Sequence, residues 1–421
     1  MAVTTSTVAQ LCERAKRASL PLGSASSEAK DAALAAIARL LDERTAAILE
    51  ANAADLADEH AAALSDALRD RLNLSAERVA AMADGVRAVA ALEDPIGEEL
   101  ERKTLESGLD LRKLRVPLGV VAVVYEARPN VTIDCAALTI KSGNAIVLRG
   151  SSYAERSNGA LAAVAREGLA EAGLPEDGVQ LLAGGDREDL AELATQDRLV
   201  DLLIPRGGEG LKAALKEVAT VPVIFAAAGN CHVYVHAEAD LEMARAIALN
   251  AKVQRPGVCN AAESLLVDAA VAADFLPGAL ADLRAAGVEL VGDERARAAA
   301  GGTEIGEAAE EDWATEYLDL KLAVGVVASL DAAVDHINRN GTRHSEAIVT
   351  ASEQASERFT TAVDAAVVYT NASTRFTDGF EFGMGAEIGN STQKLHARGP
   401  IGMRELTTYK YVVRGDGQVR G

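Results

Sequence analysis

The stretch of sequence that decides the fold is VPLGVVAVVY, at residues 116–125. A short and nearly continuous apolar run of this kind is typical of a strand that is buried on both faces of a parallel sheet. After it, short apolar runs alternate with longer segments that have helical periodicity. We therefore predict an open, mostly parallel sheet with helices on both sides. The alternating segments are 145–149, 155–172, 179–182, 186–197, 199–204, 209–218 and 221–225.

A second series of strand-like and helix-like segments begins at residues 232–236 and ends at 367–370, which predicts a second α/β unit. Residues 1–92 are alanine-rich and repeat apolar side chains at helical spacing. Residues 103–114 alternate around a Ser-Gly turn, as a hairpin does, and residues 406–414 alternate in the same way. The predicted fold class is α/β, with two open parallel sheets and a small β element.

The composition restricts the classes of function. The chain of 421 residues is 49% hydrophobic and 25% charged, as folded globular proteins are. Acidic residues outnumber basic ones by 63 to 42, and the resulting net charge of -21 disfavours binding to nucleic acid or to anionic membranes. An anionic substrate would therefore need a local basic pocket. The acidic excess fits a salt-rich cytoplasm and, equally, the acidic surface of a protein from a GC-rich genome.

The cysteines and the uncharged stretches indicate the compartment. Cys12, Cys135, Cys231 and Cys259 lack the paired spacing of a disulfide framework or a zinc site. We expect no metal site and a reduced, cytoplasmic protein. The longest uncharged stretch, residues 218–237, is interrupted by proline and glycine, so we expect no transmembrane helix.

Cys259 is the candidate for covalent chemistry. It lies in QRPGVCN, residues 254–260, which proline and glycine break into a loop between a predicted helix and a predicted strand. A loop can hold a thiol within reach of a substrate, and the positive charge of Arg255 would favour the reactive thiolate. A lone cysteine in a loop is also often inert. Cys135 and Cys231 lie among apolar residues, and we interpret them as small core side chains.

Asn130 follows the first buried strand directly, in the segment YEARPNVT. Its side-chain amide could donate a hydrogen bond to an oxyanion that develops during a reaction. A cap for the helix that begins there is an equally good interpretation of the same position.

Two turns between a strand and a helix are candidates for binding the phosphates of a nucleotide, because helix N-termini attract anions. One turn contains Arg149 and Ser151, and the other contains Gly207 and Gly208. Each is also compatible with a plain turn, since the chain has neither a G-x-G-x-x-G nor a G-x-x-x-x-G-K-[ST] motif.

The segment 371–403 is too long for a routine connection, which favours a functional loop. Arg375, Lys394, His396 and Arg398 lie in it. Concentrated cations in an acidic protein suggest an anion site, because arginine binds carboxylate or phosphate with two hydrogen bonds and lysine adds a point charge. Ion pairs between subunits are the alternative.

Four motifs give the sequence a family resemblance. Residues 116–132, 254–260, 371–379 and 391–400 closely resemble the corresponding segments of the gamma-glutamyl phosphate reductases, also called glutamate-5-semialdehyde dehydrogenases, in the aldehyde dehydrogenase superfamily. The resemblance covers nearly the whole chain in order and spacing, and the last two motifs are long and specific.

The resemblance implies an aldehyde dehydrogenase-like fold and a defined reaction. The family reduces L-glutamate 5-phosphate with NADPH to L-glutamate 5-semialdehyde and phosphate through a cysteine thioester, in the second step of proline biosynthesis from glutamate. It also implies a homo-oligomer and an association with glutamate 5-kinase. The implied parts are a cofactor domain at 1–102 and 119–230, a catalytic domain at 231–370, an oligomerisation flap at 103–118 and 404–421, and a substrate loop at 371–403 that returns to the cofactor domain.

The same resemblance assigns roles to single residues. Cys259 matches the nucleophile of the family, and Asn130 falls where aldehyde dehydrogenases keep the amide of the oxyanion hole. Glu316 is implied to meet a ribose. The cofactor-contacting residues are Arg149, Ser151, Gly207, Gly208 and Glu316, and the substrate-binding residues are Arg255, Arg375, Lys394, His396 and Arg398.

One departure from the wider superfamily bears on the reaction. Aldehyde dehydrogenases that hydrolyse their thioester carry a glutamate base before a glycine pair, whereas the matching stretch here, residues 226–230, is AAAGN and has no carboxylate. Hydrolysis of a thioester should then be slow. The competing interpretations are an NAD(P)-dependent enzyme that oxidises another aldehyde to an acid, and a non-catalytic oligomeric scaffold.

Overall fold

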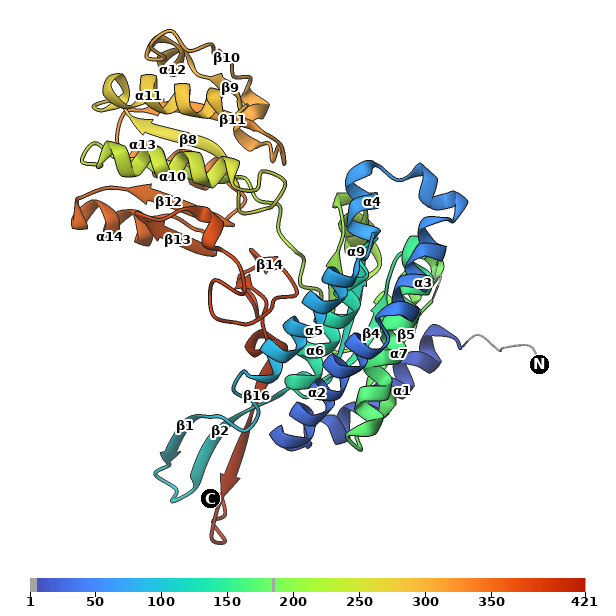
Figure 1. The fold of residues 1–421 in the computed structure, drawn as a ribbon. Helices are drawn as coiled ribbons and strands as arrows, with labels where there is room; N and C mark the ends of the chain where they lie inside the picture. Colours follow the sequence, from blue (N-terminus) through green and yellow to red (C-terminus); the bar gives the residue numbers. More distant parts are fainter. Residues whose placement is uncertain (1–5, 184–185, 421) are drawn as a thin grey trace. The chain divides into compact units, whose positions relative to one another are not determined.

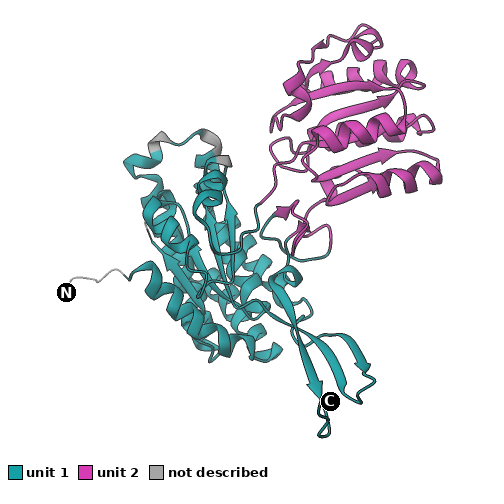
Figure 2. Cartoon of the chain, turned by 180° about the vertical axis from the view of Figure 1, so that it is seen from behind, with its two compact units in different colours: residues 1–225, 383–389, 401–421 teal, residues 226–382, 390–400 magenta. Residues whose placement is uncertain are grey.

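The computed structural model describes residues 6–183 and 186–420. Figure 1 follows the chain along these residues, and Figure 2 separates them into two compact units. Unit 1 comprises residues 1–225, 383–389 and 401–421, and unit 2 comprises residues 226–382 and 390–400. The chain therefore passes from unit 1 to unit 2 and back more than once.

Unit 1 contains a four-stranded parallel sheet in the order β5-β4-β3-β6. Every residue of the central strand β3 is buried, because helices cover the sheet and leave no face for water. This sheet is the first of the two that the alternating pattern predicts. Its strands are β3 (Val120–Tyr125), β4 (Ala145–Arg149), β5 (Val179–Leu182) and β6 (Leu202–Arg206).

Helices connect these strands and form a further layer over them (Figure 1). In that layer α2 packs against α5 and α7, and α1 packs against β4 and β5. The connecting helices are α6 (Asn130–Lys141), α7 (Glu155–Glu171), α8 (Arg187–Ala194) and α9 (Glu209–Val218). The preceding helices are α1 (Val8–Gly23), α2 (Ser27–Glu43), α3 (Thr45–Leu56), α4 (Asp66–Leu72) and α5 (Ala76–Ala90).

Two strands differ from their predictions. The apolar run at 116–125 is not one strand, because Gly119 adopts a positive φ of 129° and separates β2 from β3. The strand predicted at 221–225 is reduced to one bridge between Leu203 and Val223. Pro222, beside that bridge, has no N–H group to donate to a ladder.

A three-stranded antiparallel sheet in the order β1-β2-β16 also belongs to unit 1. Its strands are β1 (Glu99–Thr104), β2 (Asp110–Pro117) and β16 (Thr407–Arg414). The ladder between β2 and β16 runs from the pair Pro117–Thr407 to the pair Asp110–Arg414, so the end of the chain is bound to a hairpin about 300 residues earlier.

Unit 2 contains a seven-stranded parallel sheet in the order β10-β9-β11-β8-β7-β12-β13. This is the second predicted sheet, so the predicted α/β fold class is confirmed. The strands are β7 (Cys231–Val235), β8 (Ala262–Asp268), β9 (Glu289–Gly292), β10 (Gly306–Glu307), β11 (Lys321–Val327), β12 (Ser345–Val349) and β13 (Val367–Thr370). The short strands β14 (Asn390–Ser391) and β15 (Gly399–Pro400) pair with each other.

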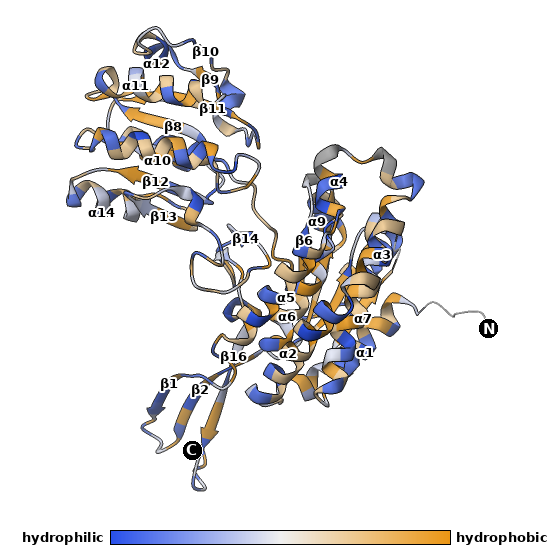
Figure 3. Cartoon of the chain, viewed as in Figure 1, coloured by the Kyte–Doolittle hydropathy of each residue, from blue (hydrophilic) through white to orange (hydrophobic). Residues whose placement is uncertain are grey.

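Alternate residues of the unit 2 strands face different helices. Val233 and Val235 of β7 lie in one apolar cluster with α10 and α11, whereas Tyr234 lies in another with α13 and α14. The strands are consequently apolar on both faces, and β8 and β12 are clearly hydrophobic in Figure 3. The helices are α10 (Leu241–Val253), α11 (Ala272–Ala285), α12 (Glu294–Ala298), α13 (Leu330–Asn340) and α14 (Glu353–Ala362).

The described part of the chain has neither a membrane-spanning helix nor a cluster of metal-binding side chains. None of its helices is both long enough and apolar enough to cross a bilayer. Nor do three or more histidine, cysteine, aspartate or glutamate side chains gather there in an arrangement that could hold a metal ion.

Close packing between α7 and α2 gives a test of the unit 1 fold. A Cβ atom at Gly168 would lie 2.4 Å from Cγ1 of Ile37 and 3.0 Å from its amide nitrogen. We predict that Gly168→Ala lowers the free energy of unfolding by about 1–3 kcal/mol, because the helices must separate. Gly159→Ala on the same helix, where no atom lies within 4 Å, should raise it by about 0.5–1 kcal/mol. Urea unfolding measures both, and equal effects would contradict the packing.

Candidate active site

Cys259 lies in the loop between α10 and β8, as predicted, and its side chain is half-buried. The segments that contain Cys259, Gly229 and Glu316 each precede a strand of the unit 2 sheet. Because those strands are parallel, the three residues lie toward the amino-terminal edge of that sheet.

The other three cysteines are buried. Burial raises the pKa of the Cys12 thiol to about 12, and it raises the pKa of Cys135 and of Cys231 as well. A thiol with a raised pKa stays protonated near neutral pH and is a poor nucleophile. Cys259 is therefore the cysteine whose exposure suits covalent chemistry.

The backbone of Cys259 is held closely by the segment that precedes β7. A Cβ atom at Gly229 would lie only 1.4 Å from the carbonyl oxygen of Cys259, so only glycine fits there. The Cys231 thiol donates to the same carbonyl oxygen at 3.2 Å. The Gly229 amide in turn donates to Oε1 of Glu316 at 2.6 Å. Glu316, which the resemblance assigns to a ribose, thus also holds the chain beside Cys259.

Arg255 lies in the loop of Cys259, and Arg375 lies in the substrate loop. Nε of Arg375 donates to Oε1 of Gln254 at 2.8 Å, which ties the substrate loop to the loop of Cys259. Burial lowers the pKa of Arg375 and the nearby positive charge of Arg255 lowers it further, while Asp378 and Cys259 act in the opposite direction. Arg375 is therefore close enough to Arg255 and to Cys259 to interact electrostatically with each of them.

The remaining cations of the substrate loop gather around Asp364. Nζ of Lys394 lies 2.8 Å from Oδ2 of Asp364, and Nη2 of Arg398 lies 2.8 Å from Oδ1. Nε of Arg343 lies 3.6 Å from Oδ2. The structure thus places Lys394 and Arg398 in ion pairs within the chain, and the exposed His396 lies between them in sequence with a positive φ of 68°. The cluster carries more positive than negative charge.

Asn130 belongs to unit 1, where it begins α6. No side-chain hydrogen bond caps this helix, and Nδ2 of Asn130 instead donates to Oδ2 of Asp134 at 2.9 Å. Burial raises the pKa of Asp134 to about 6, whereas the hydrogen bond from Asn130 and the charge of Arg206 act to lower it. An amide nitrogen carries two hydrogens, so Asn130 keeps a second one to donate.

Arg149 is the last residue of β4 and Ser151 follows it, at the carboxyl edge of the unit 1 sheet, where open α/β sheets bind ligands. Nη2 of Arg149 donates to the carbonyl oxygen of Asp186 at 3.1 Å. Burial lowers the pKa of Arg149, while the negative charges of Asp189 and Asp186 act to raise it. Oγ of Ser151 accepts from the Tyr153 amide at 3.3 Å and so caps a short turn.

Gly207 and Gly208 follow β6 at the same edge, and Gly208 is the N-cap of α9. The Gly208 amide donates to Oε1 of Glu126 at 2.9 Å. A Cβ atom at Gly207 would lie 2.9 Å from the same oxygen, so the carboxylate is packed tightly against the turn. The anion at this helix start is therefore Glu126, a residue of the chain itself.

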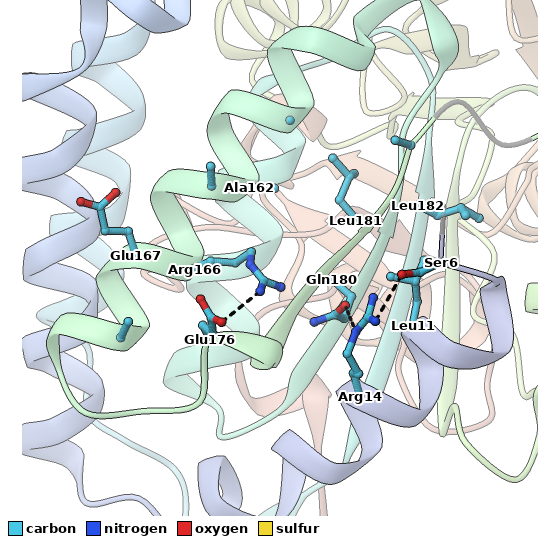
Figure 4. Close-up of a pocket in the computed structure, with 14 residues that line it drawn as sticks. Ser6, Leu11, Arg14, Ala162, Arg166, Glu167, Glu176, Gln180, Leu181 and Leu182 are labelled. Carbon is cyan, nitrogen blue, oxygen red and sulfur yellow. Dashed lines mark hydrogen bonds and ion pairs between the residues drawn. The ribbon is translucent and has the colours of Figure 1, made fainter. Parts of the chain in front are cut away.

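One pocket of unit 1, with a volume of about 680 Å³, contains none of the residues that the sequence nominates. Figure 4 shows Arg14 and Arg166 in its wall, with Gln180 between apolar side chains. Arg14 donates to Gln180 and Ser6, and its Nε lies 3.9 Å from Oδ1 of Asp177. Nη2 of Arg166 lies 3.4 Å from Oε1 of Glu176. The charges of this pocket are thus largely neutralised by groups of the chain.

The family model for the aldehyde dehydrogenase family matches residues 1–320. A gamma-glutamyl phosphate reductase of Thermobifida fusca (strain YX) is 54% identical over 98% of this chain and 98% of its own length. One from Moorella thermoacetica (strain ATCC 39073 / JCM 9320) is 54% identical over 97% of each chain. The crystal structure of gamma-glutamyl phosphate reductase from Thermotoga maritima superposes with a TM-score of 0.96 at 44% identity, over 99% of this chain and 100% of that one. The chain belongs to the gamma-glutamyl phosphate reductases of the aldehyde dehydrogenase family.

Membership in this family makes the chain an oxidoreductase and confirms the predicted resemblance. It also confirms the aldehyde dehydrogenase-like fold, with its two parallel sheets. The candidate site residues are divided between the two units. Asn130, Arg149, Ser151, Gly207 and Gly208 belong to unit 1, and Arg255, Cys259, Glu316, Arg375, Lys394, His396 and Arg398 belong to unit 2.

Several residues beside these candidates could not be identified, or were not identified, from the sequence. Asp134 stands four positions after Asn130, a spacing that places two side chains on one face of a helix and could have revealed the pair. Gly229 stands in the stretch that lacks the glutamate base, but nothing local shows that it touches Cys259. Glu126 and Asp364 carry no local signal, because their partners are more than 20 residues away in sequence.

The ion pairs of Asp364 predict a pH dependence of stability. Hydrogen bonds from Lys394 and then from Arg398 lower its pKa from 3.8 to about 2. A carboxyl group whose pKa is lower in the folded state stabilises that state above the unfolded pKa and loses this contribution as the pH falls. The difference in unfolding free energy between the unaltered chain and Asp364→Asn should therefore shrink between pH 4 and pH 2. Urea unfolding across this range measures it, and a constant difference would contradict the ion pairs.

Proposed function

We propose that this chain reduces L-glutamate 5-phosphate with NADPH to L-glutamate 5-semialdehyde and phosphate, in the second step of proline biosynthesis from glutamate. The observation that carries the proposal is the half-buried thiol of Cys259 in a loop that contains Arg255 and that is bonded through Gln254 to Arg375. A nucleophile next to two cations suits a substrate that is both an electrophile and an anion. The relatives are gamma-glutamyl phosphate reductases, which supports this substrate.

The first step is attack of the Cys259 thiolate on the acyl carbon of the substrate. The new carbon–sulfur bond forms as the carbonyl becomes a tetrahedral oxyanion, and the carbon–oxygen bond to phosphate then breaks. Phosphate departs with the electron pair, and a thioester remains on Cys259. Positive charge from Arg375 and Arg255 stabilises both the thiolate and the phosphate that leaves.

The oxyanion needs hydrogen-bond donors that are already oriented. We assign this task to the backbone N–H of Cys259 and to the side-chain amide of Asn130. Gly229 and the Cys231 thiol fix the peptide that carries Cys259. Asp134 accepts one hydrogen of the Asn130 amide and so fixes the direction of the other. Donors of this kind lower the barrier because they need no reorganisation when the charge develops.

The cations of unit 2 divide into two sets that suit the two anionic ends of the substrate. Arg255 and Arg375 lie near Cys259, where the phosphate of the acyl phosphate would be. Lys394 and Arg398, together with Arg343, surround Asp364 with an excess of positive charge. We assign the second set, with His396, to the carboxylate of the amino acid.

The alanines at 226–228 explain why phosphate and hydride, rather than water, would act on the thioester. A carboxylate at this place could activate a water molecule, but an alanine methyl group cannot accept a proton. The thioester then persists until it is reduced, and a proton on the departing sulfur restores the thiol as the aldehyde forms.

Unit 1 suits a nicotinamide cofactor, which supplies the hydride when it is bound. Arg149, Ser151, Gly207 and Gly208 lie at the carboxyl edge of a parallel sheet, the edge at which such folds bind nucleotides. Arg149 brings a positive charge for a phosphate, and Gly208 brings a helix N–H, from which Glu126 would have to move. Glu316 is assigned to a ribose, and the preference for NADPH rests on the resemblance.

The three-stranded sheet of unit 1 is proposed as the surface that joins copies of the chain. Tyr409, Tyr411 and Val413 alternate along β16 and each is about half exposed, as residues of a buried interface would be in a single chain. Association with glutamate 5-kinase and a cytoplasmic location stay predictions from the sequence.

The reverse reaction tests the proposed function. Oxidation of L-glutamate 5-semialdehyde should depend on inorganic phosphate, because phosphate must release the acyl group from Cys259. The assay follows formation of the reduced cofactor with NADP⁺ and with NAD⁺ over a range of phosphate concentrations. We expect saturation with phosphate and a faster rate with NADP⁺. Oxidation to free glutamate at a rate independent of phosphate would indicate the competing aldehyde-oxidising activity.

Two cysteine variants complete this assay. Cys259→Ser should lose more than about 10³-fold in rate and still bind NADPH, since only the nucleophile is changed. Cys12→Ala removes a buried thiol of unit 1 and should retain the rate. Near-normal turnover in Cys259→Ser would remove the thioester from the mechanism.

A further inference from the structure

Asn260, the residue after Cys259, is a buried side chain that the reaction above does not use. Its Nδ2 donates to the carbonyl oxygen of Thr377 at 2.8 Å and to that of Arg375 at 3.4 Å. Both acceptors belong to the substrate loop, more than 110 positions later in the chain. The Asn260 side chain thus bonds to the backbone of the loop that contains Arg375.

The backbone of Asn260 makes a second connection to the same loop. Its carbonyl oxygen accepts from Oγ1 of Thr374 at 2.6 Å. Thr377 is fixed from the other side, because its Oγ1 lies 2.6 Å from Oγ of Ser345 and 2.8 Å from the hydroxyl of Tyr369. The short helix at Thr374–Phe376 is therefore held between the Cys259 loop and strands β12 and β13.

The hydrogen bonds fix the orientation of the Asn260 amide. Both groups that face Nδ2 are carbonyl oxygens, which only accept, so a flipped amide would oppose oxygen to oxygen. Oδ1 is buried and has no hydrogen-bond partner. A buried acceptor without a partner lowers the stability of the fold. The side chain keeps this orientation in spite of that cost, because its two donated hydrogen bonds stabilise the fold.

The consequence concerns Arg375. Its backbone carbonyl accepts a hydrogen bond from the Asn260 side chain, and its own side chain donates to Gln254 at the start of the Cys259 loop. Without the Asn260 side chain, the backbone of Arg375 would be held only through its neighbours Thr374 and Thr377, and its guanidinium by the exposed bond to Gln254. Exposed hydrogen bonds between flexible side chains hold a position weakly.

We propose that Asn260 is a positioning residue, which holds the substrate loop against the Cys259 loop so that the positive charge of Arg375 acts on the thiol. The proposal rests on the proposed function, since it assumes that Cys259 is the nucleophile and that Arg375 binds the anionic substrate. It can be tested without any turnover, so that a failure of either proposal is distinguishable from a failure of the other.

The charge at the thiol can be measured with two alkylating reagents. Iodoacetate is an anion and iodoacetamide is neutral, and both react with the same thiolate. The ratio of their rate constants at Cys259, followed by mass spectrometry of the peptide that contains it, cancels changes in exposure and in the fraction of thiolate. A positive charge within several ångströms in a hydrated site should raise this ratio about threefold.

We expect Arg375→Ala to lower the ratio about threefold, since it removes the charge from the thiol. Asn260→Ala should lower the ratio by a smaller factor, because the loop loses the two bonds from the Asn260 side chain and keeps the bond from Thr374 to the backbone. The double variant should show no further fall beyond that of Arg375→Ala. Asn52→Ala is the matched control, because Asn52 is a buried asparagine of unit 1 that also bridges backbone groups. It should lower the temperature of unfolding and leave the ratio unchanged.

Three outcomes would overturn the proposal. An unchanged ratio in Asn260→Ala with a lowered ratio in Arg375→Ala would show that Arg375 keeps its place alone. An unchanged ratio in Arg375→Ala would show that its charge does not act on the thiol. Thr374→Val removes the hydroxyl that donates to Asn260 and serves if Asn260→Ala does not fold; an unchanged ratio there would equally count against the proposal. A lowered ratio without phosphate-dependent oxidation would overturn the proposed function alone.

Discussion

Only a hydrogen atom fits between the Cα of residue 229 and the carbonyl group of Cys259, because a Cβ atom there would lie 1.4 Å from the carbonyl oxygen. This contact joins the segment that enters unit 2 to the loop that carries the thiol. The same glycine donates its amide hydrogen to Glu316, and the next buried residues, Asn230 and Cys231, bond to groups of the surrounding loops. Backbone packing thus sets the position of the Cys259 loop. The side chains near the thiol are not needed to hold it in place and are available to supply positive charge.

Electrostatics supply the second constraint. A chain with a net charge of -21 repels anions over most of its surface, so a substrate with a phosphate and a carboxylate needs concentrated positive charge. Unit 2 provides it at two places, around Cys259 and around Asp364. In unit 1 a carboxylate of the chain, Glu126, occupies a helix start that could attract a phosphate. A cofactor that binds there would compete with this internal anion.

The sequence predicted local features well and long-range ones poorly. Apolar runs bounded by helical segments gave both sheets, and proline and glycine near Cys259 gave the loop that exposes it. The prediction of one strand at 116–125 was wrong because Gly119 interrupts the apolar run. The positive φ of Gly119 separates β2, in the antiparallel sheet, from β3, in the parallel sheet of unit 1. Two sets of contacts join distant segments. Asp364 pairs with Lys394 and Arg398, and Asn260 donates a hydrogen bond to Thr377. No spacing rule encodes such contacts, so they could not be predicted.

The central claim is that Cys259 becomes acylated and that only phosphate or hydride removes the acyl group. The most direct measurement mixes the chain with L-glutamate 5-semialdehyde and NADP⁺ in the absence of phosphate. The account predicts a burst of reduced cofactor that is stoichiometric with the chain, an acyl group on the peptide that contains Cys259, and renewed turnover when phosphate is added. Continuous turnover without phosphate, or an acyl group on any other residue, would contradict it.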